Sequence, residues 1–162
     1  MKSMKTLVAV FVAALALCLT GCKKDNNEDL IIGSWEVTSM EYISVVSGYT
    51  GESAEMNGTY HETETPEPGT SMVITFNKDN TLTMSYTEEG RPAGMENGSY
   101  SISGDNITLT YNEEGDTYVE TYHIDKLDKS SLSLSMNDSY DDTEDGQHGH
   151  VDMTVKLNFK KK

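Results

Sequence analysis

The sequence has 162 residues and a formal net charge of −15 at pH 7, with 27 acidic residues against 12 lysines and arginines. A chain of this length forms one domain, and its acidity argues against a nucleic-acid partner, because phosphate binding needs a basic surface. The cysteines are Cys18 and Cys22, both close to the N-terminus, so a disulfide framework is excluded.

The first 21 residues have the pattern of an export signal. Lys2 and Lys5 precede an uncharged, mainly apolar run over residues 6–20, which is shorter than the roughly 20 residues needed to cross a bilayer. The run ends in Leu19-Thr20-Gly21-Cys22 and resembles the lipobox of bacterial lipoproteins. The resemblance implies a signal peptide over 1–21, cleavage before Cys22, and acyl chains such as palmitate on that cysteine. We therefore expect a lipid-anchored protein of the outer membrane.

A charged tether is expected over residues 22–29, ahead of a domain over 30–162. Lys23 and Lys24 are followed by acidic and amide residues up to Asp29, a composition too polar to pack. Lysines followed by acids here resemble the surface-export signal of lipoproteins in the Bacteroidota, which implies a domain on the cell surface. The alternative is a solvated linker that carries a periplasmic domain.

The rest of the chain has the composition of an all-β protein. After the tether it contains only two alanines, Ala54 and Ala93, against 15 serines and 16 threonines, which favours strands over helices. Apolar and polar residues alternate between turn signals. Eight strands are predicted, the first over 33–46 and the others over 72–76, 82–86, 100–102, 107–111, 118–124, 132–136 and 151–159.

Nearly every predicted strand has one apolar and one polar face, as in a sheet with one side buried. Eight antiparallel strands joined in chain order can close into an up-and-down barrel, whose interior holds side chains or one small ligand. A two-sheet β-sandwich satisfies the same pattern. In the first strand Trp35 and Val37 share one parity whereas Met40 and Tyr42 share the other, so a β-bulge is predicted near Ser39.

Gly33-Ser34-Trp35 opens the first strand and resembles the Gly-x-Trp signature of the lipocalin-like families. The chain from about Leu30 to Phe159, including residues 75–81 at the first hairpin, is similar to lipocalin-like lipoproteins of the Bacteroidota. In such a barrel Gly33 lets the backbone pass closely beneath the end, and the indole of Trp35 closes it.

The same resemblance implies a cation late in the chain that covers the tryptophan. The single arginine, Arg91, lies in a predicted mid-chain loop. Lys156 and Lys160 are therefore the expected candidates.

The predicted interior is rich in tyrosine and methionine. Such side chains either line a site for a small, partly apolar ligand or simply fill the barrel. The candidate ligand-lining residues are Tyr86, Tyr100, Tyr111, Tyr118, Tyr122, Met72, Met84 and Met136. Glu120 shares the parity of the tyrosines at 118 and 122. It either points inward near an opening, where a carboxylate needs a partner, or is turned outward by a local bulge, and the bulge is the favoured expectation.

Two long loops are predicted, over residues 47–70 and 137–150, and loops of this length on a rigid barrel often carry binding residues. The second loop partly matches the spacing of a calcium loop and also contains a His-x-His pair, which suits zinc. The candidate ligands are Asp141, Asp145, His148 and His150, and the alternative is a solvated acidic loop. A calcium-dependent adhesin is the corresponding third function.

The sequence contains no nucleophile elbow, phosphate loop or His-Glu-x-x-His motif, so no enzyme is expected and, apart from calcium or zinc, no cofactor. The favoured function is a lipid-anchored, surface-exposed, lipocalin-like protein that binds a small, partly apolar ligand. The alternative is a structural or protein-interaction module of the outer membrane, with a filled barrel and acidic loops that meet a protein partner.

Overall fold

The computed structural model describes residues 26–113, 115–144 and 146–162, and most of them lie in strands. In chain order the elements are α2 (Asn27–Ile31), β1 (Gly33–Ser47), the 3₁₀ helix η1 (Gly51–Met56), β2 (Gly58–Glu64), β3 (Ser71–Phe76), β4 (Thr81–Glu88), β5 (Arg91–Ser103), β6 (Asn106–Glu113), β7 (Asp116–Leu127), β8 (Ser131–Glu144) and β9 (Gln147–Lys161).

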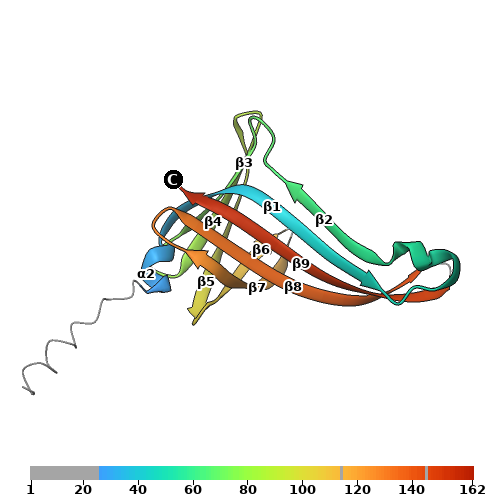
Figure 1. The fold of residues 1–162 in the computed structure, drawn as a ribbon. Coiled ribbons are helices and arrows are strands. Elements are labelled where there is room, and N and C mark those ends of the chain that lie inside the picture. The colour runs from blue at the N-terminus through green and yellow to red at the C-terminus, as the bar shows by residue number, and fades with distance from the viewer. Residues whose placement is uncertain (1–25, 114, 145) are drawn as a thin grey trace, which may run out of the picture.

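Eight of these strands, β1 and β3 to β9, close into an antiparallel up-and-down barrel (Figure 1). Each strand from β3 to β8 pairs with its successor, and β1 pairs with both β3 and β9 to complete the ring. The barrel is therefore the correct prediction and the sandwich is excluded. The bulge in β1 is confirmed as well, because the register with β9 shifts between Val37 and Ser39.

The core lies at the end of the barrel where β1 begins. Trp35, Phe76, Leu82 and Leu134 are at most 1% exposed there, as expected of inward-facing residues on alternating strands. Helix α2 covers this end and buries Ile31 completely, and the backbone carbonyl of Ile31 accepts a 2.6 Å hydrogen bond from the indole Nε1 of Trp35. We term this the closed end.

Helix α2 begins inside the segment expected to be a tether. The side-chain amide of Asn27 donates hydrogen bonds to the carbonyl oxygen of Gly104 and to Oδ1 of Asp105, both at 3.2 Å. The expectation that residues up to 29 do not pack is thus wrong from Asn27 onward, because hydrogen bonds dock this polar segment onto the β5–β6 turn. No helix in the described part of the chain is both long enough and apolar enough to span a membrane.

The barrel wall divides between β7 and β8 towards its other end. These strands pair only where His123–Leu127 meets Leu132–Ser135. Beyond that region, residues 116–122 of β7 pair with β6 and residues 136–144 of β8 pair with β9. We term this the parted end of the barrel.

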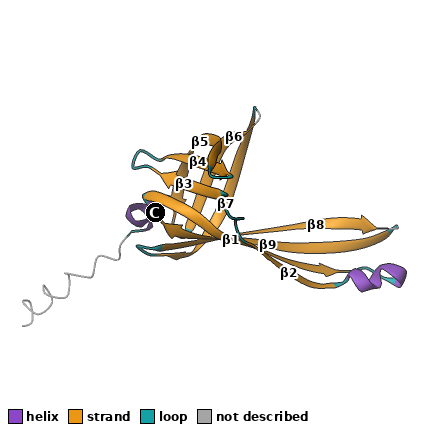
Figure 2. Ribbon diagram, turned by 90° about the horizontal axis from the view of Figure 1, so that it is seen from above, coloured by secondary structure: helices purple, strands orange, loops and turns teal. Residues whose placement is uncertain are grey.

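Strands β1, β8 and β9 extend beyond the barrel. Together with β2 they form a four-stranded arm that points away from β3–β7 (Figure 2). Residues 40–46 of β1 pair with β2, from Met40 opposite Glu64 to Val46 opposite Gly58. The loop predicted over 47–70 is therefore wrong in part, since it contains η1 and β2. The loop predicted over 137–150 is wrong for most of its length, because β8 and β9 continue through it as a hairpin.

Candidate functional site

At the closed end, Lys161 covers the indole of Trp35. Its Nζ lies 4.8 Å from the ring centroid and donates a hydrogen bond of 3.2 Å to the carbonyl of Leu30. Gly33 makes room for this lysine: its φ is +125°, and a Cβ there would lie 2.9 Å from Cε of Lys161. The backbone conformation therefore requires glycine here, and the absence of a Cβ leaves room for Lys161 to lie over Trp35.

The expectation that Lys156 or Lys160 covers Trp35 is wrong, because the register of β1 and β9 places Trp35 opposite Lys161. Lys160 instead forms an ion pair of 3.0 Å with Glu36. The hydrogen bond from Lys160 lowers the pKa of the Glu36 carboxyl, and this effect, together with the charge of Lys160, outweighs the opposing effect of burial.

The candidate ligand-lining residues differ in depth. Met84, Tyr100 and Tyr122 are buried, with exposed fractions of 3%, 7% and 7%. Half-buried against the core lie Met72, Tyr86, Tyr111 and Met136. Tyr118 is 41% exposed. The structure therefore brings some of the predicted set into the core and leaves the rest accessible.

Tyr100 and Met84 both pack in the hydrophobic core. The ring of Tyr100 packs edge-on against Phe76, with the centroids 5.0 Å apart, and its hydroxyl donates a hydrogen bond of 2.7 Å to the carbonyl of Asn77. Burial raises the pKa of the Tyr100 hydroxyl. The sequence pattern could not separate these two residues from the others, because all of them share the inward parity.

Tyr111 and Tyr118 form a stacked aromatic pair at the parted end. They lie opposite each other on β6 and β7, with ring centroids 5.6 Å apart and an interplanar angle of 18°. Gly98 lies opposite Tyr111 on β5, where a Cβ would overlap the backbone oxygen of Thr110 and lie 3.0 Å from Cβ of Tyr111. The glycine thus allows β5 and β6 to approach closely at this pair.

Glu120 faces inward, so the bulge expected to turn it outward is wrong. The register of β6 and β7 is continuous from Asn106 to Glu113, and it places Glu120 opposite the buried Leu109. The hydroxyl of Tyr122 donates a hydrogen bond of 2.8 Å to Oε2 of Glu120, which supplies the partner that an inward carboxylate needs. Burial, followed by the hydrogen bond to Glu120, raises the pKa of Tyr122 well above its ordinary value.

Three further inward residues were not among the predicted site residues. Met40 and Tyr42 follow the bulge in β1, and the hydroxyl of Tyr42 lies 3.9 Å from the sulfur of Met40. Tyr42 lies opposite Val155 on β9, which in turn lies opposite Met136 on β8. Glu96 has the inward parity of Tyr100 and lies opposite Met84 on β4. The change of parity after the bulge in β1 is the sequence signal that could have identified Met40 and Tyr42 as inward-facing.

The candidate metal ligands lie on the arm. Nδ1 of His150 is 2.8 Å from Oδ1 of Asp141 and its Nε2 is 3.4 Å from Oδ1 of Asp152; the hydrogen bond to Asp141 raises the pKa of His150. Nδ1 of His148 lies 3.2 Å from Oγ1 of Thr143. In the part of the chain that the structure describes, no three histidine, cysteine or acidic side chains are placed to hold a metal ion together. Asp145 and the lipidation candidate Cys22 lie outside the described residues.

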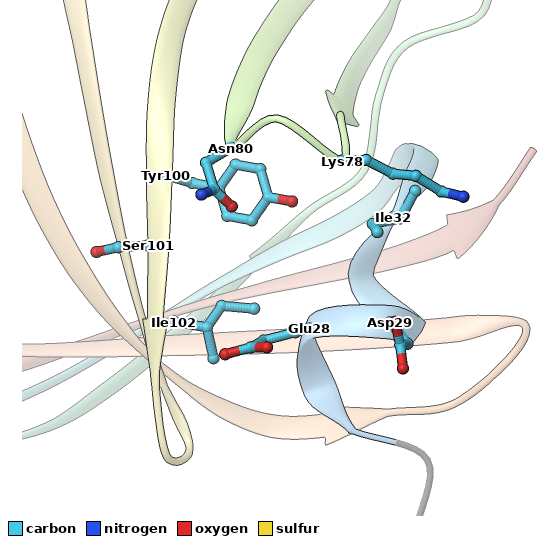
Figure 3. Close-up of a pocket in the computed structure, with 8 residues that line it drawn as sticks. All are labelled: Glu28, Asp29, Ile32, Lys78, Asn80, Tyr100, Ser101 and Ile102. Carbon is cyan, nitrogen blue, oxygen red and sulfur yellow. The ribbon is translucent and has the colours of Figure 1, made fainter.

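Two hollows lie apart from the parted end. The larger, of about 430 Å³, is at the closed end between α2, the β3–β4 turn and β5 (Figure 3). Its lining combines Glu28 and Asp29 with Lys78, and of the predicted ligand-lining residues it includes Tyr100. The smaller, of about 280 Å³, lies beside β1 and the segment between β2 and β3.

A family model described as a lipocalin-like domain matches residues 31–134. Among solved structures, a lipocalin-like protein from Bacteroides uniformis is 16% identical with a TM-score of 0.46, over 82% of this chain and 98% of that one. A second, an uncharacterized protein from Bacteroides eggerthii, is 15% identical with a TM-score of 0.46, over 82% and 99% of the two chains. No curated protein is significantly similar. Because the family match spans more than half of the sequence, the chain belongs to the lipocalin-like domain family.

Proposed function

We propose that this protein is a lipid-anchored, surface-exposed member of the family that binds a small, partly apolar ligand at the parted end of its barrel, without catalysis. The observation that carries the proposal is the incomplete burial of the inward face there. Met72, Tyr86, Tyr111 and Met136 are half-buried there, whereas most inward residues of the closed end, such as Trp35, Phe76 and Leu134, are buried. Inward apolar side chains that the protein itself leaves partly uncovered are suited to contact a ligand.

The side chains at the parted end have the chemistry of such a site. The stacked rings of Tyr111 and Tyr118 offer a flat apolar wall, and methionine side chains such as Met136 adapt to different shapes. The hydrogen-bonded pair of Tyr122 and Glu120 places polar atoms on the same face. An apolar wall with a few fixed polar groups is the usual composition of a small-molecule site.

The proposed lipid anchor would attach close to the opposite end of the barrel. Cys22 lies four positions before Asn26, where the described residues begin, and four residues of extended chain span at most about 14 Å. Because α2 docks on the closed end, an acyl chain on Cys22 would hold that end towards the membrane. The parted end would then face the medium, from which a ligand arrives.

Native mass spectrometry of the protein purified from its own host tests this function. Wild-type protein should carry an additional small-molecule mass, and Met136→Trp should lose it because the larger side chain covers the inward face. Met95→Trp is the matched control, since Met95 lies on the outward face of β5 and is 68% exposed. Absence of any additional mass, or its retention by Met136→Trp, would argue against the proposal.

A protein-interaction role is favoured by a different observation, namely the exposed apolar side chains of the arm. Val45, Tyr60 and Tyr140 are 43%, 51% and 49% exposed on β1, β2 and β8. Together with the acidic residues of the arm they would suit a protein partner in the outer membrane. In the native mass spectrum, an additional mass in the range of a polypeptide, lost when the protein is denatured, would favour this role over binding of a small ligand.

A further inference from the structure

We propose that Asp138 and Asp142 mask the outer edge of the arm and thereby keep this chain from pairing with a second copy of itself through β8. The inference concerns the arm alone, and it holds whether or not a ligand occupies the parted end. It is carried by the register of β8 and by the hydrogen bonds of these two aspartates.

Along the arm, β8 is an edge strand. Residues 136–144 pair with β9 on one side, and in the part of the chain that the structure describes no strand pairs with their other side. We term this other side the outer edge of β8. Most side chains of this stretch are exposed. An exposed strand edge of this length is a template on which another strand can form hydrogen bonds.

The backbone groups of β8 point alternately towards β9 and towards the outer edge. The N–H of Lys161 donates a hydrogen bond to the carbonyl of Ser130, so the odd-numbered residues of β9 are those whose backbone groups face β8. Their partners on β8 are the even-numbered residues, and the register continues without a shift to Glu144. The backbone groups of the odd-numbered residues of β8, among them Ser139 and Thr143, therefore face the outer edge.

The N–H groups of these two residues are occupied by side chains of β8 itself. The N–H of Ser139 donates a hydrogen bond of 2.8 Å to Oδ1 of Asp138. The N–H of Thr143 donates one of 2.8 Å to Oδ1 of Asp142, whose other carboxylate oxygen accepts a hydrogen bond of 2.8 Å from the hydroxyl of Tyr49. A strand that paired with the outer edge would have to displace both carboxylates from N–H groups that it needs for its own hydrogen bonds.

The charges of the same aspartates also oppose a second copy. A two-fold antiparallel pair of β8 strands centred on Tyr140 would place Asp138 of each copy opposite Asp142 of the other. Like charges that lie directly opposite each other on paired strands are destabilising. Tyr140 is 49% exposed and would meet Tyr140 of the other copy at the centre. An aromatic contact would therefore favour this pairing once the aspartates are removed.

Sedimentation velocity tests the masking on residues 22–162 with Cys22→Ser, which keeps every described element and removes the thiol. The protein with both aspartates should sediment as a monomer. Asp138→Ala/Asp142→Ala should form a dimer, with a dissociation constant at least about tenfold lower, because two opposed pairs of charges and two masked N–H groups are released.

Glu52→Ala/Glu55→Ala is the matched control. It removes two exposed carboxylates from η1, at the end of the same arm, and should remain monomeric. Dimerisation of this control to the same extent would assign the effect to net charge and overturn the masking. A dimer of the protein with both aspartates, or an alanine variant that stays monomeric at the highest concentration measured, would overturn it as well.

The variant Asp138→Asn/Asp142→Asn separates the hydrogen bonds from the charges. It removes both charges but keeps an oxygen that accepts from each N–H group, so it should dimerise less than the alanine variant. Equal dimerisation of the two variants would leave no role for the hydrogen bonds and would contradict the masking of the N–H groups.

Oxidative cross-linking locates the contact between copies. Tyr140→Cys, added to the alanine variant, should give a disulfide-linked dimer, because residues directly opposite each other on antiparallel strands lie within the range of a disulfide. Thr59→Cys on β2, in the same background, is the control and should remain unlinked. Cross-linking of the Thr59→Cys variant in place of the Tyr140→Cys variant would place the contact on β2 and overturn the role of β8.

Discussion

Lys161 and Trp35 form a cation–π pair that ends the barrel, with Nζ 4.8 Å from the indole centroid. The two residues lie opposite each other on β9 and β1, so the pair joins the last strand of the chain to the first. Lys161 also reaches the carbonyl of Leu30, and Trp35 reaches that of Ile31, which ties helix α2 to the same junction. The β1–β9 pairing that closes the barrel and the helix α2 that covers its end are thus connected at the same place.

Replacing this cation should loosen the closed end. Lys161→Met keeps the length of the side chain but removes the cation–π contact and the hydrogen bond to Leu30, so we expect a loss of about 0.5–2 kcal/mol in the free energy of unfolding. Trp35 is the single tryptophan, and its fluorescence during urea denaturation reports the transition. Lys160→Met, which removes an exposed ion pair with Glu36, should change stability by less than half as much.

Gly149 supports the packing of Tyr49 at the far part of the arm. A Cβ at this position would overlap ring carbons of Tyr49, whose hydroxyl donates a hydrogen bond of 2.8 Å to Oδ2 of Asp142. Gly149→Ala should therefore displace the ring and release the segment around η1, at a cost of about 1–3 kcal/mol.

Hydrogen exchange of residues 48–57 checks this result, with faster exchange expected in Gly149→Ala. Gly94→Ala is the control, since the nearest atom to its Cβ, Cδ2 of Tyr86, lies at an ordinary 3.5 Å. Exchange rates in η1 that match wild type in both variants would show that Tyr49 is not held by this contact.

Alkaline pH should weaken the hydrogen bond between Tyr49 and Asp142. Burial and the hydrogen bond to Asp142 raise the pKa of Tyr49 from 10.0 to about 12. Because the folded state favours the neutral phenol, the stabilisation is complete below pH 10 and is lost as the pH rises through about 12. The difference in melting temperature between wild type and Tyr49→Phe should therefore shrink above pH 10. A difference that is constant with pH would contradict the raised pKa.

Removal of the expected acylation site should release the protein from membranes. Cys22→Ala leaves the barrel intact but provides no thiol for the lipid, so the protein should move to the soluble fraction of the host. Protease treatment of intact cells then decides orientation for the wild type, since a surface domain is cleaved and a periplasmic one is protected. Continued association of Cys22→Ala with the membrane would rule out the lipid anchor.

Alternation along the chain predicted the strand order of the barrel and the bulge in β1, because these depend on which residues face the core. It left a two-sheet sandwich open, and the resemblance of Gly33-Ser34-Trp35 to the lipocalin-like families favoured the barrel. Strand β2 could not be predicted in this way: all its side chains are exposed, and only its pairing with the overhanging part of β1 makes it a strand. The arm formed by β8 and β9 beyond residue 136 was missed for the same reason, since acidic residues interrupt its apolar face.

Details of the site depend on contacts that alternation does not report. Lys161 rather than Lys160 covers Trp35 because of the strand register, which shifts at the bulge. Glu120 remains inward because Tyr122, two residues away on the same face, supplies a hydroxyl. Parity could identify the inward tyrosines but not how deeply each is buried. Tyr100 is buried, for example, whereas Tyr111 is half-buried.

Methyl NMR of methionine-labelled protein tests the central claim most directly, because methionines lie at the parted end and away from it. During titration with 1-octanol, the methyl signals of Met136, Met72 and Met40 should shift with a common saturating curve. Those of Met56 in η1 and Met95 on the outward face of β5 should stay constant. Shifts confined to Met56 and Met95, or no shift at any methionine, would contradict a ligand site on the inward face of the parted end.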